Sequence, residues 1–204
     1  MRNTTLARLG LALLLGPAIA VSAQEVTQTE KDRALQYLES TKANLLKATR
    51  DLSEAQWNFK PAPERWSVAQ VMEHIAASED FIRDNLLKGK VMASSPGQPD
   101  RDVIKIDEAV LTMIPDRTRK AQAPQPLEPR NRFGSPEKST EHFLESRITT
   151  EQYLKNTTGL RDHVMDGPVG KMDGYEFILF IAAHCERHTK QIEEVEADPK
   201  FPKT

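Results

Sequence analysis

Apolar residues recur every three or four positions along four long stretches of the chain, which is the period of an amphipathic helix. The pattern predicts helices over residues 29–52, 67–88, 135–159 and 173–198, with a shorter one over 104–114. Residues that favour a helix start open the four long ones: Thr29, Ser67, Ser135 and Asp173. Gly89 is a natural stop for the second helix. No strand-like alternation competes, and residues 162–171 are expected to form a loop.

Four long helices predict an all-α fold, a four-helix bundle with a long crossover between helices 2 and 3. The crossover contains the short helix and then a segment, residues 115–136, with five prolines and several basic residues. Proline removes a backbone donor and breaks helices, so this segment is expected to be an extended connector on the bundle surface.

The first residues have the pattern of an export signal. Arg2 and Arg8 precede a short apolar run over residues 9–20, and small residues follow at 21–23. This order predicts a signal peptide over residues 1–23 with cleavage before Gln24, and the apolar run is too short to span a bilayer. Residues 24–204 then form one domain, placed in the periplasm or secreted.

Charge and cysteine content restrict the partners and the chemistry. The chain has 28 Lys and Arg against 30 Asp and Glu, interspersed, for a formal net charge of −2. A mildly acidic chain lacks the basic face that nucleic acid or an anionic membrane requires, so neither is expected as a partner. The single cysteine, Cys185, cannot form a disulfide within the chain. Its place on an apolar stripe predicts a small buried hydrophobe rather than a ligand or nucleophile.

The candidate chemistry starts with two histidines in the last helix. His184 and His188 are four residues apart, so both imidazoles project from the same side of that helix. That side is apolar, because Ile181, Cys185 and Ile192 lie on it. Two histidines on a buried stripe either bind a divalent metal or need hydrogen-bond partners.

A third histidine, His74, lies on the flank of the apolar stripe of the second long helix, where it can reach a neighbouring helix. Three neutral imidazoles, from His74, His184 and His188, leave at least one coordination position open. That arrangement is typical of a catalytic metal site rather than a structural one.

Two stretches that contain these histidines, residues 52–74 and 173–192, make the chain resemble the DinB/YfiT-like superfamily of metal-binding four-helix bundles. Trp-Ser before a helix that carries one histidine, followed at a distance by His-x-x-x-His, is the shared pattern. The resemblance implies a divalent ion, commonly zinc or nickel, held by His74, His184 and His188. Relatives include thiol-dependent S-transferases and proteins described as metal-dependent hydrolases. The predicted export signal is a difference from those thiol-transferases, which are cytosolic.

Acidic residues near the histidines are the candidates for accepting hydrogen bonds from the ligands or for proton transfer. Glu79 returns toward the His74 side of its helix and is the candidate general base, whereas Glu73 is expected to be solvated. Glu186 is rotated away from His184. A His-Glu-x-x-His protease motif would need glutamate where Cys185 stands, so a zinc-protease function is excluded.

Four other side chains are assigned non-catalytic roles. Trp57 and Trp66 are expected to pin the proline-containing loop between them onto the bundle rather than to form a wall of the site. His142 and His163 are expected to be solvated, on a polar face and in a loop.

The sequence therefore predicts an exported protein that binds a divalent metal, as a hydrolase or thiol/S-transferase acting on an unknown small-molecule substrate. The alternative is a non-enzymatic protein of the stress response, a homodimer that binds metal or a small ligand. A third interpretation is a metal-free bundle whose histidines only form hydrogen bonds.

Overall fold

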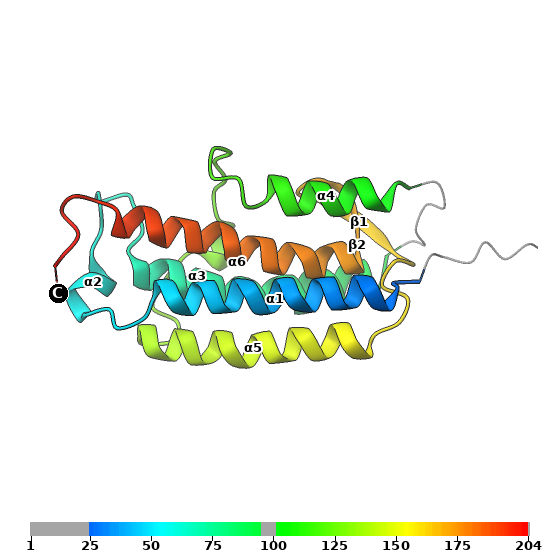
Figure 1. Ribbon diagram of the computed structural model, residues 1–204, viewed down its shortest axis with the longest axis horizontal. Helices are drawn as coiled ribbons and strands as arrows, with labels where there is room; N and C mark the ends of the chain where they lie inside the picture. Colours follow the sequence, from blue (N-terminus) through cyan, green and yellow to red (C-terminus); the bar gives the residue numbers. More distant parts are fainter. Residues whose placement is uncertain (1–24, 95–100, 204) are drawn as a thin grey trace, which may run out of the picture.

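Four long helices run side by side along the molecule and enclose its core (Figure 1). The computed structural model describes residues 25–94 and 101–203; the predicted signal peptide lies outside them. The bundle helices are α1 (Gln28–Ala48), α3 (Val68–Asp80), α5 (Pro136–Asn156) and α6 (Gly174–Glu196). α1 packs against α6 and α5, and α3 packs against the same two helices from the other side. The predicted four-helix bundle is confirmed.

Capping residues set where the helices begin. The side chains of Ser67 and Asp173 each accept a hydrogen bond from the backbone N–H three residues on. The side chain of that residue in turn accepts from the backbone N–H of the cap. Ser135 caps α5 in the simpler form, so these three predicted starts are confirmed. α1 begins earlier than predicted, because Thr27 rather than Thr29 caps it and forms a reciprocal pair with Glu30.

Gly89 does not end the second long helix, contrary to the prediction. α3 passes directly into a π-helix, η1 (Phe81–Val91), which runs through Gly89. Leu87 and Val91 on either side of it are fully buried. Burying two large apolar side chains outweighs the roughly 1 kcal/mol that glycine costs in a helix.

The expected loop over residues 162–171 is also wrong in part, because it contains a β-hairpin. β1 (Val164–Gly167) and β2 (Gly170–Asp173) pair antiparallel across a two-residue turn. Gly170 has φ +114°, which the turn requires and side chains disfavour. Met172 of β2 is fully buried in the core, so tertiary burial holds strands that lack a strand-like sequence pattern.

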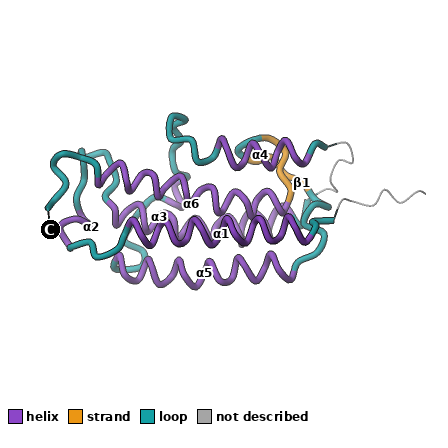
Figure 2. Tube along the Cα trace, in the orientation of Figure 1, coloured by secondary structure: helices purple, strands orange, loops and turns teal. Residues whose placement is uncertain are grey.

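The crossover between the second and third bundle helices covers the outside of the bundle. It contains α4 (Val103–Met113), which packs against α6, and a short 3₁₀ helix, η2 (Gln125–Leu127), which contacts α3. Residues 114–134, called the connector below, contain η2 and are otherwise loop between α4 and α5 (Figure 2). A further short helix, α2 (Glu54–Asn58), precedes α3.

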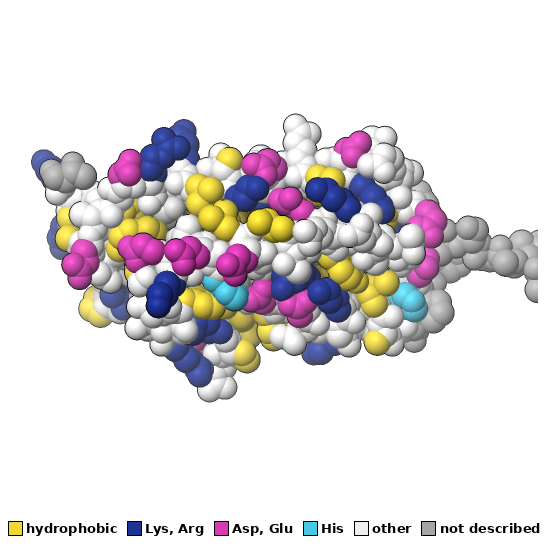
Figure 3. Space-filling view, turned by 90° about the horizontal axis from the view of Figure 1, so that it is seen from below, with side chains coloured by type: hydrophobic (Ala, Val, Ile, Leu, Met, Phe, Trp, Pro, Cys, Tyr) yellow, Lys and Arg dark blue, Asp and Glu magenta, His cyan; other side chains and the backbone are white. Residues whose placement is uncertain are grey.

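The core consists of two apolar clusters, and a buried ion pair lies between them. One cluster includes Leu38 and Ile82, and the other includes Leu45 and Ile75. Glu79 and Arg147 occupy the intervening level of α3 and α5. Of the helices described, none combines the length and hydropathy needed to cross a membrane. One face of the molecule carries acidic, basic and apolar side chains intermingled (Figure 3).

Candidate metal centre

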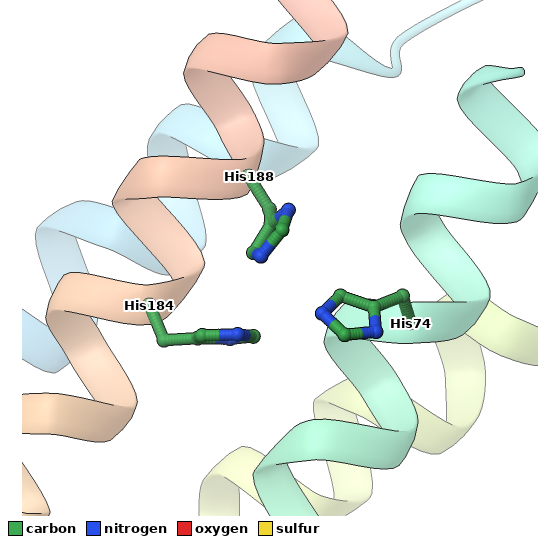
Figure 4. Close-up of side chains that lie close together, drawn as sticks. All are labelled: His74, His184 and His188. Carbon is green, nitrogen blue, oxygen red and sulfur yellow. The ribbon is translucent and has the colours of Figure 1, made fainter. Parts of the chain in front are cut away.

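The three predicted histidines converge on one point between two bundle helices. His184 and His188 project from α6 toward His74, which projects from α3 (Figure 4). One ring nitrogen from each can be chosen so that all three lie within 4.8 Å of one another. The centroid of the His188 ring lies 4.5 Å from that of His74 and 4.4 Å from that of His184. The i,i+4 spacing on α6 places the rings of His184 and His188 side by side, and the packing of α3 on α6 brings the ring of His74 to them.

A backbone carbonyl orients the ring of His74. Its Nδ1 lies 2.9 Å from the carbonyl oxygen of Leu127 in η2. A carbonyl only accepts, so Nδ1 carries the proton and Nε2 keeps its lone pair. The hydroxyl of Ser78, one turn along α3, lies 3.5 Å from Nε2.

His188 is oriented in the same way by a side chain of its own helix. Its Nδ1 lies 2.8 Å from Oε1 of Gln191. Nη1 of Arg117 lies 3.4 Å from the same oxygen, which agrees with the amide orientation. Nδ1–H therefore donates here too, and Nε2 is left with a lone pair. Histidines that bind metal commonly donate their other ring N–H to an oxygen in this manner.

Burial keeps the three rings neutral. It lowers the pKa of His74, and it lowers the pKa of His184 and of His188 well below the ordinary value, with the neighbouring imidazoles lowering the last two further. His74 and His188 are buried and His184 is half-buried. Three neutral nitrogen donors with at least one coordination position left open suit zinc or nickel, so the residues present fit a divalent ion.

Aromatic side chains stand on two sides of the cluster. The ring of Trp66 lies 4.9 Å from that of His74, and the ring of Phe180 lies 5.8 Å from that of His184, between centroids. Trp66 thus forms a wall of the site and does more than pin a loop. Trp57 is buried in the apolar cluster at the α2 end of the bundle, in accordance with its predicted role.

Glu79 is not among the groups that converge on the histidines. Its two carboxylate oxygens accept from Nε and Nη2 of Arg147, at 2.7 and 2.8 Å. The candidate general base is thus engaged in the buried ion pair. Glu186 accepts from the hydroxyl of Tyr37 at 2.6 Å and pairs with Lys190. Cys185 is fully buried, as predicted.

Three residues expected in solvent are instead held by the fold. Glu73 is 5% exposed, and its carboxylate accepts three backbone N–H groups of the connector. His142 lies 2.5 Å from a carboxylate oxygen of Asp80 and stacks on Phe133. His163 lies 2.8 Å from the carbonyl oxygen of Ser94. Each hydrogen-bond partner is distant in the sequence, so local polarity gave no signal for these bonds.

Arg187, the residue before His188, was not singled out by its sequence position. It is 8% exposed and donates to backbone carbonyls of the connector: Ile114 at 3.2 Å, and Asp116 and Arg119 at 2.5 Å. The signal available in the sequence was an arginine between two candidate ligands, because a guanidinium that becomes buried on a helix needs several acceptors.

Comparison with known proteins places this arrangement in a family. The sequence profile of the DinB superfamily matches residues 37–192, which include all three histidines. The uncharacterized protein YuaE of Bacillus subtilis is 29% identical over 149 residues, 71% of this chain and 85% of YuaE. The structure of YfiT from Bacillus subtilis, described as a probable metal-dependent hydrolase with an unusual four-helix bundle topology, superposes with a TM-score of 0.54 at 18% identity. That superposition covers 84% of this chain and 88% of YfiT, and it shows a shared fold. The chain belongs to the DinB superfamily.

Proposed function

We propose that this protein is a metal-dependent hydrolase that holds one zinc or nickel ion through Nε2 of His74 and His188 and a ring nitrogen of His184. The observation that carries the proposal is the convergence of three neutral imidazoles, two of which have their Nδ1–H committed to an oxygen. YfiT, which shares the fold, is described as a probable metal-dependent hydrolase.

The residues around the proposed ion site have different roles. A bound divalent ion would supply Lewis acidity, which polarises a substrate oxygen and lowers the pKa of water at the site. The Leu127 carbonyl holds His74 and Gln191 holds His188 so that the Nε2 lone pair of each ring would be available to a bound ion. Trp66 and Phe180 restrict the approach of solvent from two sides. Because three protein ligands would leave a coordination position open, a substrate group could reach a bound ion.

The substrate we propose is a small molecule rather than nucleic acid or membrane. The mildly acidic chain and the mixed charge of the surface in Figure 3 support this choice.

We also propose that the chain is exported, on the pattern of residues 1–23. Export predicts that protein recovered outside the cytoplasm begins at Gln24, which N-terminal sequencing checks. A chain that keeps Met1 to Ala23 would contradict it.

Metal content tests the site directly. Protein purified without chelator or metal resin is expected to carry about one zinc or nickel ion per chain by elemental mass spectrometry. His184→Ala should lose the ion, and His163→Ala, which alters a histidine outside the cluster, should keep it.

Hydrolysis of a panel of esters, amides and phosphoesters should then disappear on chelation. A second panel with low-molecular-weight thiols covers S-transfer. No ion, and no uptake of added zinc or nickel, would refute the proposal.

A second function is favoured by one observation. Glu73 and Glu79, the acidic residues beside His74 on α3, are both committed to arginine or backbone partners. A site whose two neighbouring carboxylates are both engaged suits a protein that binds metal or a small ligand without catalysis. Bound metal that is lost in His184→Ala, together with no turnover in any panel, would favour this function over hydrolysis.

A further inference from the structure

The residue immediately before a candidate ligand is a buried charge in two places. Glu73 precedes His74 on α3, and Arg187 precedes His188 on α6. Both side chains point their charged groups at the backbone of the connector, residues 114–134. The carboxylate accepts N–H groups near its end, and the guanidinium donates to carbonyls near its start. The connector is therefore bonded to both helices that supply the histidines.

The contacts of Glu73 use most of the capacity of its carboxylate. Oε1 accepts the backbone N–H of Arg130 at 2.7 Å and of Arg132 at 3.2 Å, and also Nε of Arg132 at 3.1 Å. Oε2 accepts the N–H of Asn131 at 2.8 Å. Burial alone would raise the pKa of Glu73, but these donors hold it below its usual range, so the group is a carboxylate at neutral pH.

Arg187 is the counterpart of Glu73 with the charges reversed. Its three acceptors are carbonyls of the connector. In residues 25–94 and 101–203, no carboxylate lies within ion-pair distance of its guanidinium. A planar guanidinium can satisfy several carbonyls at once, whereas an ammonium group cannot match that geometry. The residue is therefore built to bind backbone rather than to neutralise an acid.

Between these two attachments, the connector brings one backbone group to the histidines. The carbonyl oxygen of Leu127 accepts from Nδ1 of His74. Leu127 itself is 6% exposed, so its side chain is anchored as well. The hydrogen bond exists only while residues 125–132 stay against α3, and Glu73 is the side chain of α3 that holds residues 130–132 there.

We propose that Glu73 and Arg187 are positioning residues for the metal centre: by fixing the connector across it, they hold the Leu127 carbonyl on His74 and so fix His74 in the Nδ1–H form, with Nε2 turned to the other imidazoles. This inference rests on the proposed metal site for its consequence, but the tautomer itself belongs to the metal-free protein. Loss of an oxygen partner of this kind commonly weakens metal binding about 10–100-fold.

Glu73→Gln tests the proposal with a small change in shape. The amide introduced by Glu73→Gln keeps one acceptor oxygen, but its NH₂ group replaces the other. Two donors cannot bond to each other, so at least one backbone N–H of the connector loses its acceptor. In the metal-free protein, ¹H–¹⁵N correlation spectra are expected to show His74 as Nδ1–H in the wild type and as a mixture of tautomers in Glu73→Gln. The dissociation constant for zinc, from competition with a chromophoric chelator, should rise about 10–100-fold.

Asp107→Asn is the matched control, because it also neutralises a buried carboxylate that accepts hydrogen bonds, from Arg161 near the far end of the bundle. It should leave both the His74 tautomer and zinc binding unchanged. Arg187→Lys is the second variant: it keeps the charge, loses the planar fork and should change His74 in the same direction as Glu73→Gln. In the wild type, slow exchange of the amides of residues 130–132 is expected whether or not the variants fold.

The outcomes separate this proposal from the proposed function. A folded Glu73→Gln protein with His74 fully in the Nδ1–H form and wild-type zinc binding would overturn the positioning role. Fast exchange of the amides of residues 130–132 in the wild type would also overturn it. If the wild type binds neither zinc nor nickel, the proposed function fails, and the tautomer and amide exchange of the metal-free chain still decide the positioning role.

Discussion

Removing Arg147 should destabilise the protein more than removing one partner of any exposed ion pair would. Its side chain is fully buried, and that of Glu79 is 1% exposed. Arg147 binds both oxygens of Glu79 on α3, and the carbonyl of Leu38 and the hydroxyl of Thr41 on α1. It thus connects three of the four bundle helices at the level between the two apolar clusters. Within the described residues, Glu79 has no other hydrogen-bond partner.

Arg147→Met leaves the Glu79 carboxylate buried without compensation, which costs about 3–5 kcal/mol. Each kcal/mol lowers the melting temperature of a chain this long by about 2–4 °C. Thermal unfolding followed by circular dichroism should therefore show a fall of roughly 6–20 °C. Thr41 is not stranded, because its hydroxyl already donates to the Leu38 carbonyl at 3.1 Å.

The double variant Arg147→Met/Glu79→Met distinguishes a buried pair from a general packing defect. Apolar side chains of similar volume replace both charges, and such replacements are often neutral or stabilising by about 1–4 kcal/mol. The double variant should therefore recover most of the lost melting temperature. A double variant as unstable as Arg147→Met, or a single variant within about 2 °C of the wild type, would refute this account of the core.

Three further predictions concern the helix ends and the pH dependence. Ser67→Ala removes the cap of α3, whose hydroxyl accepts from the Gln70 N–H at 3.3 Å, and should cost about 0.5–2 kcal/mol in urea unfolding; no change would mean that water replaces the cap. Gly174→Ala should destabilise despite alanine's higher helix propensity, because a Cβ there would lie 2.7 Å from the Leu160 carbonyl; a more stable variant in the same assay would contradict this. Burial, and then the Asp173 carboxylate, raise the pKa of Glu176 to about 8. The stability that protonated Glu176 contributes is therefore complete below about pH 4.5 and is lost as the pH rises through about 8. The urea concentration at the midpoint of unfolding should fall less steeply between about pH 5 and 9 in Glu176→Gln than in the wild type, and an equal slope would count against a raised pKa of Glu176.

The bundle helices could be located from the sequence because their signals are local. Apolar spacing and the caps Ser67, Ser135 and Asp173 act within one or two turns, and the structure confirms those starts. The errors arose where tertiary contacts override local preference. Gly89 stays helical because Leu87 and Val91 are buried around it, and the hairpin exists because Met172 enters the core.

The sequence by itself determined the His184–His188 pair, since i,i+4 spacing on one helix fixes both directions. The direction of His74 across α3 was also predictable from its place beside the apolar stripe. Only the tertiary structure decided what surrounds them. Glu79 binds Arg147, and Glu73 and Arg187 bind the connector, which brings the Leu127 carbonyl to His74. Those contacts join segments far apart in the chain, and several use backbone groups that every residue carries, so no residue pattern records them.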